Sequence, residues 1–419
     1  MSDDLDGWGG AEFVLAADRL DTPDVVEAAD PGDMLRQVAS AGAQVRTALR
    51  SCAETDLSAL TPDARPRAIV VAGIGGSALA GELLNAMTGL ASPVQVVVSP
   101  AERLPGWVGA ADTVLAVSCS GTTPETLAIA TEAARRGCRL AAAAAEGSPL
   151  HRIAEQARAP FVPVVSAGLA RSMLWAVTVP LLVMAERLGV TRIGADVYEL
   201  AARRLEEVSH QCRPASESFV NPGKSLALDL VGALPLVWGT SVLSGVAARR
   251  FASQLNENAK YPAIAGLLPE AAHSQVAVFD GPFAPRSSRL SVPGPQEPGP
   301  ARSSPALPNP TLPSPDDLAD WDLDYEEAEP ASGFTALRLV LIADPDEDAR
   351  VSAQRAAVTE LAGQRGVGLS ELAMDGEHPL VRLAGVIQLT DYASVYLAIA
   401  SGIDPGQTVA IRDLQTRIE

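Results

Sequence analysis

Apolar and polar positions along the chain alternate in a regular way from about residue 68 onward. Residues 68–72 are continuously apolar, and a helix-spaced pattern follows a glycine-rich turn as far as about Met87. Further apolar runs, separated by helical patterns such as the one from about Pro124 to Arg136, cover residues 93–99, 113–118, 139–145 and 160–165. Continuous apolar strands that alternate with helices indicate a parallel sheet covered on both faces.

A second alternation of the same kind begins further along the chain. An apolar run at 233–241 precedes a helical pattern at 245–259, and another apolar run follows at 337–344. Two such units indicate an internal duplication. We therefore predict a helical N-terminal segment (1–60), a first α/β domain (61–200) and a second (215–419).

An anomalous segment at about 283–333 interrupts the second unit. It is rich in proline and serine and ends in the acidic run "DWDLDYEEAE". Such a composition cannot bury a core, so a flexible surface insertion is predicted. A solvated loop is favoured over an interaction motif at Trp321 and Tyr325.

Composition and charge narrow the class of protein. The net charge of −19 over 419 residues argues against a nucleic-acid partner. The acidic N-terminus is not a secretory signal, and the uncharged stretch 230–248 contains Pro235 and Gly239, which favour a strand, a turn and a helix over a membrane span. Four cysteines without a CxxC pair fit a reducing cytoplasm. We expect a cytoplasmic protein with no membrane contact, no metal and no cofactor.

The turn "GIGGS" after the first strand has the layout of a phosphate-binding loop. It is not a P-loop, because no lysine follows it. Gly73, Gly75 and Ala78 also satisfy the dinucleotide-binding pattern, but that fold needs an acidic residue at the end of the second strand. Glu102 is the nearest carboxylate there and matches poorly. The turn alone leaves a nucleotide and a sugar phosphate both open.

A second loop, "SCSGTT", follows the third strand and precedes a helix that begins near Pro124. Hydroxyl groups and free N–H groups at a helix N-terminus bind anions without a lysine or an arginine. A dinucleotide-binding fold has no use for this loop, so two loops at successive strand ends favour a phosphate site. The residues predicted to hold the phosphate are Gly76, Ser77, Ser118, Ser120 and Thr123.

These two loops resemble the G-x-G-G-S and S-x-S-G-x-T motifs of the sugar isomerase (SIS) domain family. Three further segments resemble the bifunctional phosphoglucose/phosphomannose isomerase subfamily: "GLARSMLW" at 168–175, "QLNENAKYPAIAGLLPEAAHSQV" at 254–276 and "SVYLAIASGIDPGQTVAIRDLQ" at 394–415. The resemblance implies an α/β fold of two flavodoxin-like SIS domains, each a parallel sheet with helices on both faces.

The resemblance also implies an activity and roles for three residues. The activity is an aldose–ketose isomerisation that interconverts glucose 6-phosphate, mannose 6-phosphate or both with fructose 6-phosphate through a cis-enediolate. Glu257 would be the base that moves the proton between C1 and C2. Arg171 would stabilise the enediolate, and His273 would assist ring opening. In related enzymes that histidine comes from the partner subunit, which implies a homodimer with shared active sites.

Three positions depart from the subfamily pattern. Ala170 stands where proline precedes the arginine, "AHSQ" surrounds His273, and Gln415 replaces a lysine near the C-terminus. Loss of that lysine removes a cation from the expected substrate pocket. A phosphosugar-binding regulatory protein without efficient chemistry is therefore the main alternative, and the retention of Glu257, Arg171 and His273 together opposes it. NAD binding at the first turn is a third, weaker alternative.

Overall fold

The computed structural model describes residues 16–61, 65–89, 92–284 and 336–418. Nearly all of the segment predicted as an insertion, with Trp321 and Tyr325, therefore lies outside the described residues.

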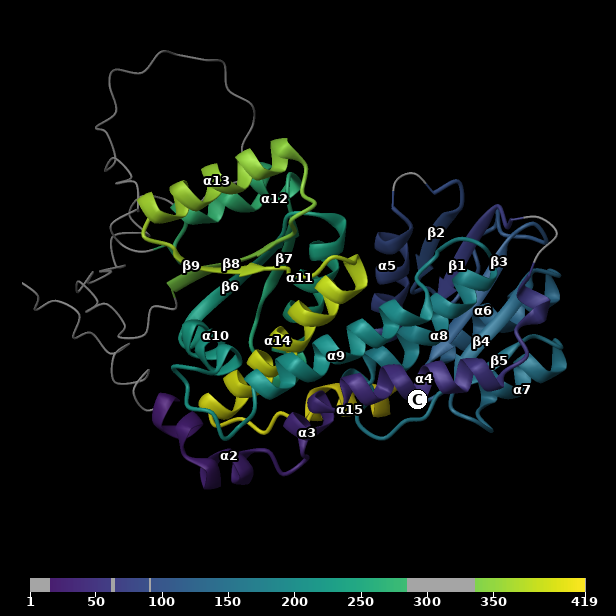
Figure 1. Cartoon of the computed structure of the whole chain (residues 1–419), viewed down its shortest axis with the longest axis horizontal. Coiled ribbons are helices and arrows are strands. Elements are labelled where there is room, and N and C mark those ends of the chain that lie inside the picture. The colour runs from purple at the N-terminus through teal and green to yellow at the C-terminus, as the bar shows by residue number, and fades with distance from the viewer. Residues whose placement is uncertain (1–15, 62–64, 90–91, 285–335, 419) are drawn as a thin grey trace, which may run out of the picture.

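Two parallel sheets form the cores of the two α/β units (Figure 1). The first has the order β2-β1-β3-β4-β5 and the second β7-β6-β8-β9, and every adjacent pair in these described sheets is parallel. The strands are β1 Ala68–Ala72, β2 Gln95–Ser99, β3 Thr113–Ser118, β4 Arg139–Ala144, β5 Phe161–Pro163, β6 Ala233–Gly239, β7 Ile264–Leu267, β8 Ala336–Ala343 and β9 Gly368–Ala373. The predicted fold class is confirmed.

Helices surround both sheets. A helical stretch at 16–21 leads into α2 Pro23–Ala29, α3 Met34–Ala39 and α4 Ala41–Glu54. The first unit contains α5 Gly76–Thr88, α6 Pro124–Arg135, α7 Pro149–Gln156 and α8 Leu174–Arg187, and α9 Ala195–Gln211 follows it. The second unit contains α10 Pro222–Leu230, α11 Val242–Gln254, α12 Glu270–His273, α13 Ala349–Gln364, α14 Pro379–Ala400 and α15 Val409–Ile418.

Strand β1 shows why these strands are apolar throughout. All five of its residues are buried. Ile69 and Val71 belong to the core shared with α4, α5 and α8, whereas Val70 and Ala72 belong to a separate core with α6 and α7. Because successive strand residues point to opposite faces, a strand covered on both faces must be apolar at every position.

Helix α14 lies between the two units and packs against α9, α10 and α11. Its length and composition would allow it to cross a membrane, but 94% of its most apolar stretch is buried inside the protein. It is a buried core helix of the second unit (Figure 1). The stretch 230–248 is the end of α10, strand β6, a turn and the start of α11, as its sequence predicted.

Two strands, β7 and β9, have no counterpart in the sequence prediction. They are the outer strands of the second sheet. β7 has only four residues, and β9 carries polar residues and is largely half-exposed. An edge strand buries less of its surface than a central one, so its sequence lacks the continuous apolar run that marks β1 and β3.

Candidate active site

The two predicted phosphate loops meet at the carboxyl edge of the first sheet. Strands β1 and β3 are neighbours, and the chain leaves them toward opposite sides, to β2 and to β4. Loops that follow such neighbouring strands form a crevice where parallel sheets bind ligands. A cavity of about 190 Å³ lies here. Its walls are formed by Ile74, Gly75, Gly76, Ser77, Ser118, Cys119, Ser120, Thr123, Ala170, Arg171, Val177, Arg250 and Glu257.

The first loop needs glycine at two positions. Gly75 has φ 58° and ψ −123°, a conformation that side-chain-bearing residues avoid. A Cβ on Gly73 would lie 2.8 Å from the Cβ of Ser77. Helix α5 begins at Gly76, directly after this tight turn. Ser77 therefore lies in the first turn of the helix, where anions are favoured.

The second loop is organised by its own hydroxyl groups. The backbone N–H of Gly121 donates to Ser118 Oγ at 3.0 Å, and that oxygen lies 3.0 Å from Thr123 Oγ1. Ser120 Oγ lies 2.9 Å from Thr122 Oγ1. These bonds fix the hydroxyls before any ligand binds. All five predicted phosphate-site residues are among the residues that line the cavity.

Arg171 and Glu257 line the same cavity although they lie far apart in the sequence. Arg171 lies in a short 3-10 helix, Ala170–Ser172, and its Nε donates to Asn258 Oδ1 at 2.8 Å. Its Nη2 donates to the carbonyl oxygen of Gly406 at 2.8 Å. Burial lowers the pKa of Arg171, while the nearby charge of Glu257 raises it. An arginine stays charged at any relevant pH, so it is a fixed cation beside the carboxylate.

Glu257 lies in a π-helical turn, Leu255–Ala259, that extends α11. Such turns are rare and occur frequently at functional sites. The turn ends at Lys260, which has φ 55° and donates from Nζ to the carbonyl oxygens of Asn258 and Asp404 at 3.0 and 2.8 Å. Burial and the neighbouring Arg171 lower the pKa of Lys260. Lys260 thus holds the π-helical turn against the segment before α15.

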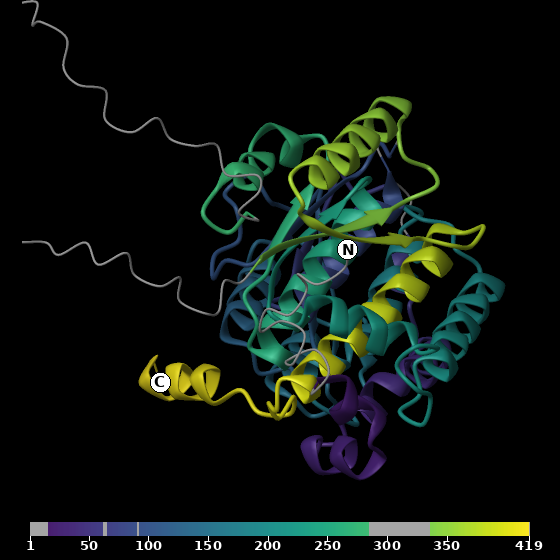
Figure 2. The same ribbon diagram turned by 90° about the vertical axis from the view of Figure 1, so that its left-hand side faces the viewer.

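Two of the residues discussed from the sequence do not line this cavity. His273 is the last residue of α12 and is exposed. Gln415 is exposed on α15, the C-terminal helix that extends away from the rest of the molecule (Figure 2). Cys119 does line the cavity, but burial raises the pKa of its thiol, which keeps it protonated and fits a small filler rather than a nucleophile.

Sequence reasoning missed Arg250. It lies on α11, is only 3% exposed and lines the cavity. Its ion-pair partner is Asp391 on α14, which is 6% exposed. The signal available in the sequence was a pair of arginines, Arg249 and Arg250, in a helix that is otherwise mostly apolar and small. An arginine that such a helix buries requires a buried partner.

The corresponding edge of the second sheet already holds a carboxylate. Strands β6 and β8 are neighbours there, and the loop after β6 carries Thr240 and Ser241. Ser241 Oγ donates to Asp344 Oδ2 at 2.6 Å, and Thr240 Oγ1 accepts from the Asp344 backbone N–H at 3.0 Å. Arg382 Nε lies 3.3 Å from Asp344 Oδ1. The hydroxyl groups of the loop after β6 are therefore already hydrogen-bonded to an aspartate of the chain itself.

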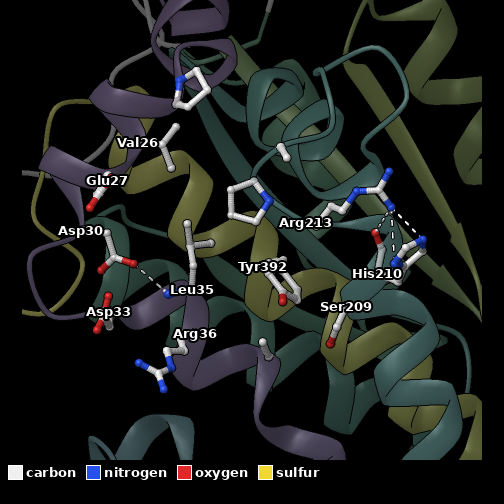
Figure 3. A pocket seen from close by; sticks show the side chains of 14 residues that line it. Val26, Glu27, Asp30, Asp33, Leu35, Arg36, Ser209, His210, Arg213 and Tyr392 are labelled. Atoms are coloured by element: carbon white, nitrogen blue, oxygen red, sulfur yellow. Dashed lines mark hydrogen bonds between the residues drawn. The ribbon is translucent and has the colours of Figure 1, made fainter.

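A separate cavity of about 590 Å³ lies between α2, α3 and the end of α9 (Figure 3). Leu35 and Tyr392 contribute apolar walls, and charged side chains surround them. Asp30 Oδ2 accepts from the Leu35 N–H at 2.8 Å, and Arg213 Nη1 lies 2.7 Å from His210 Nε2. Several polar groups here are already paired with one another. In the described ranges, no group of three or more His, Cys, Asp and Glu side chains is placed to hold a metal ion.

Comparison with known families gives a match to the second half of the chain. Residues 219–418 match the family described as "Bacterial phospho-glucose isomerase C-terminal SIS domain". This half of the chain is a SIS domain of the bacterial phosphoglucose isomerase type. The resemblance that the sequence motifs indicated is thereby confirmed.

Curated relatives of this chain carry more than one activity in their names. A bifunctional phosphoglucose/phosphomannose isomerase from Caldicellulosiruptor bescii is 29% identical over 214 residues, 51% of this chain and 63% of that protein. A D-glucosamine-6-phosphate 4-epimerase from Sulfolobus acidocaldarius is 28% identical over 207 residues, 49% of this chain and 62% of that protein. The chain thus spans less than two thirds of the length of either relative.

The fold is similar to that of solved sugar-phosphate enzymes along nearly the whole chain. A glucose-6-phosphate isomerase from Chlamydia trachomatis superposes with a TM-score of 0.63 and 13% identity, over 98% of this chain and 85% of that structure. At this identity the similarity concerns the fold alone.

Proposed function

We propose that this chain is an aldose–ketose isomerase that interconverts glucose 6-phosphate, mannose 6-phosphate or both with fructose 6-phosphate. The observation that carries the proposal is the shared cavity: a carboxylate, Glu257, and a fixed cation, Arg171, line the same 190 Å³ space as the two hydroxyl-bearing loops. Isomerisation needs these three parts, namely an anchor for the phosphate, a base for the carbon-bound proton and a positive charge for the enediolate.

Each part has a defined task in the proposed reaction. Ser77, Ser118, Ser120 and Thr123, with the backbone at Gly76, bind the phosphate and so fix the other end of the open-chain sugar. Glu257 accepts the proton from C2 of the aldose and returns it to C1, while a hydroxyl proton moves from O2 to O1. Arg171 stabilises the negative charge on the cis-enediolate between these two transfers.

His273 and the homodimer belong to the same proposal. His273 is exposed and lies apart from the cavity of its own chain, as expected of a residue that serves a partner subunit. On α15, Val409, Ile411 and Leu414 are 52%, 44% and 60% exposed, and a second copy would cover such apolar side chains. We propose a cytoplasmic homodimer in which His273 of one subunit opens the sugar ring in the site of the other.

A coupled assay on the purified chain tests the activity. We expect fructose 6-phosphate to form from at least one of the two aldose phosphates, and Glu257→Gln to abolish turnover while binding persists. Phosphosugar binding with no turnover by the wild type would contradict the proposal and favour the regulatory alternative. A product altered only at C4 of glucosamine 6-phosphate would instead place the chain with the epimerase relative.

Mixed dimers test the shared site. Glu257→Gln and His273→Asn are each expected to be inactive alone. If His273 acts in the partner's site, subunit exchange between the two variants regenerates one intact site in each mixed dimer, so activity reappears. Absence of recovery in verified mixed dimers would contradict the shared site while leaving the isomerase activity itself untouched.

A further inference from the structure

Arg250 is held in the cavity wall by a buried carboxylate. Its Nε and Nη2 donate to Oδ1 and Oδ2 of Asp391 at 2.9 and 2.8 Å, a two-point contact between α11 and α14. Bidentate pairs of this kind fix the plane of the guanidinium as well as its position. Burial raises the pKa of Asp391, and the charge of Arg250 opposes that rise. The carboxylate is therefore a dedicated partner for this one arginine.

The pair extends into a closed ring of hydrogen bonds around the catalytic turn. Arg250 Nη2 also donates to the carbonyl oxygen of Arg171 at 2.6 Å. Arg171 in turn donates to Asn258, and Asn258 Nδ2 donates to Ser394 Oγ at 2.9 Å. Ser394 Oγ donates to the carbonyl oxygen of Asp391 at 2.7 Å, which closes the ring on α14. Arg171 is thus held both by its backbone and by its side chain.

Resting on the isomerase function proposed above, we propose that Arg250 is the second cation of the substrate site and that the Arg250–Asp391 pair positions Arg171. Among the residues that the structure describes, Arg171 and Arg250 are the two cationic side chains that line the cavity. The phosphate of a hexose phosphate carries close to two negative charges near neutral pH, and the enediolate adds another. With Glu257 present as well, one arginine leaves the occupied cavity strongly negative. Arg250 lines the cavity and Asp391 does not, so this ion pair turns its positive end toward the bound anion and offsets part of that charge locally.

A purely structural role makes a different prediction. Removing one partner of a buried ion pair leaves an unpaired charge and is strongly destabilising, whereas replacing both by apolar residues of similar size is often tolerated. If the pair only joins α11 to α14, the apolar double replacement should restore both folding and activity. If Arg250 serves the substrate site, that replacement should restore folding alone.

The principal variant is therefore Arg250→Met/Asp391→Leu in the full chain. A matched control applies the same change to the ion pair Lys224–Asp21, in which the lysine is buried and the aspartate is exposed. Its Nζ–Oδ1 distance is 3.3 Å and it lies outside the cavity, and the control variant is Lys224→Met/Asp21→Leu. Urea unfolding establishes that both are folded. We expect the principal variant to lose about 10²–10³-fold in kcat/KM, the range found when one oxyanion-stabilising donor is removed. The control should keep the wild-type value.

A milder variant covers the case in which the double replacement fails to fold. Arg250→Lys keeps the charge but cannot make both contacts to Asp391 and the contact to Arg171. We expect its kcat to fall more than its KM rises, because the misplacement of Arg171 affects the transition state most. A folded double variant, or Arg250→Lys, with kcat and KM within a few-fold of wild type would overturn the proposal.

Binding measurements separate this proposal from the isomerase function. Calorimetry with fructose 6-phosphate should show weaker affinity for the double variant than for wild type and control. If wild type binds the sugar phosphate but turns over no substrate, the isomerase proposal fails, and the affinity comparison still decides whether Arg250 serves the site. Equal affinities in all three folded proteins would then overturn the role of Arg250.

Discussion

Gly121 lies in the second predicted phosphate loop, "SCSGTT", and its replacement tests the geometry of this loop against a matched control. Gly121 and Gly137 both have φ 69°, where an alanine costs about 1–2 kcal/mol for the left-handed backbone alone. The space around them differs. A Cβ on Gly137 meets nothing within 4 Å, whereas a Cβ on Gly121 would lie 2.2 Å from Ser148 Oγ and 2.5 Å from Ser148 Cβ.

Gly121→Ala must therefore displace Ser148 or move the loop itself. Ser148 caps α7 by accepting from the His151 N–H at 3.2 Å, and loss of such a cap costs about 1 kcal/mol. We expect Gly121→Ala to lower the free energy of unfolding by about 2–3 kcal/mol in total, against about 1–2 kcal/mol for Gly137→Ala.

The two variants should also differ in phosphate binding. A shift of the loop moves Ser118, Ser120 and Thr123 away from the positions in which they are hydrogen-bonded, so affinity for inorganic phosphate should fall in Gly121→Ala and not in Gly137→Ala. Urea denaturation and isothermal titration calorimetry measure the two effects. Equal stabilities and equal phosphate affinities in the two variants would refute the reasoning.

Three further predictions concern thiols, stoichiometry and a buried lysine. Burial raises the pKa of Cys52 and of Cys212 from 9.0 to about 12, so the folded chain holds these protons more tightly than the unfolded chain. That stabilisation is complete below pH 9 and is lost toward pH 12, by up to about 1.4 kcal/mol per thiol and pH unit. In Cys52→Ala/Cys212→Ala, the free energy of unfolding measured with urea should therefore fall less steeply with pH than in wild type, and an equal fall would contradict this prediction. Because Asp344 is hydrogen-bonded to the hydroxyls of Thr240 and Ser241 in the loop after β6, calorimetry should find one inorganic phosphate per chain, and two would contradict that assignment. Lys224→Met removes the donor to Asp21 and should lower the free energy of unfolding by about 1–3 kcal/mol with kcat/KM unchanged, whereas a loss of kcat/KM would contradict a purely structural role.

The parts of the fold that the sequence predicted are those encoded locally. Strands β1 and β3 are read directly from apolar runs, because both of their faces are covered by helices. The two phosphate loops follow those strands immediately, and neighbouring parallel strands bring their carboxyl ends together. That the two loops meet at one cavity was therefore predictable without knowledge of any contact distant in sequence.

The parts that the sequence did not predict depend on distant contacts. Arg250 and Asp391 are 141 positions apart, and neither residue type in its local pattern specifies the other as partner. The π-helical turn around Glu257 has the apolar spacing of an ordinary helix end. The roles proposed for Glu257 and Arg171 came from the family resemblance. The structure adds that Asn258 and the carbonyl oxygens of Pro405 and Gly406 hold Arg171 in the wall of the same cavity as Glu257.

The central claim is that Glu257 moves a carbon-bound proton of a hexose phosphate held by the two loops. The most direct measurement is deuterium incorporation from D₂O into fructose 6-phosphate and its aldose product, followed by proton NMR. The account predicts that the wild type introduces deuterium at C1 of the ketose and C2 of the aldose. Glu257→Gln should introduce none, while Glu360→Gln on the exposed face of α13 should match the wild type. Exchange by Glu257→Gln at the wild-type rate would contradict the account.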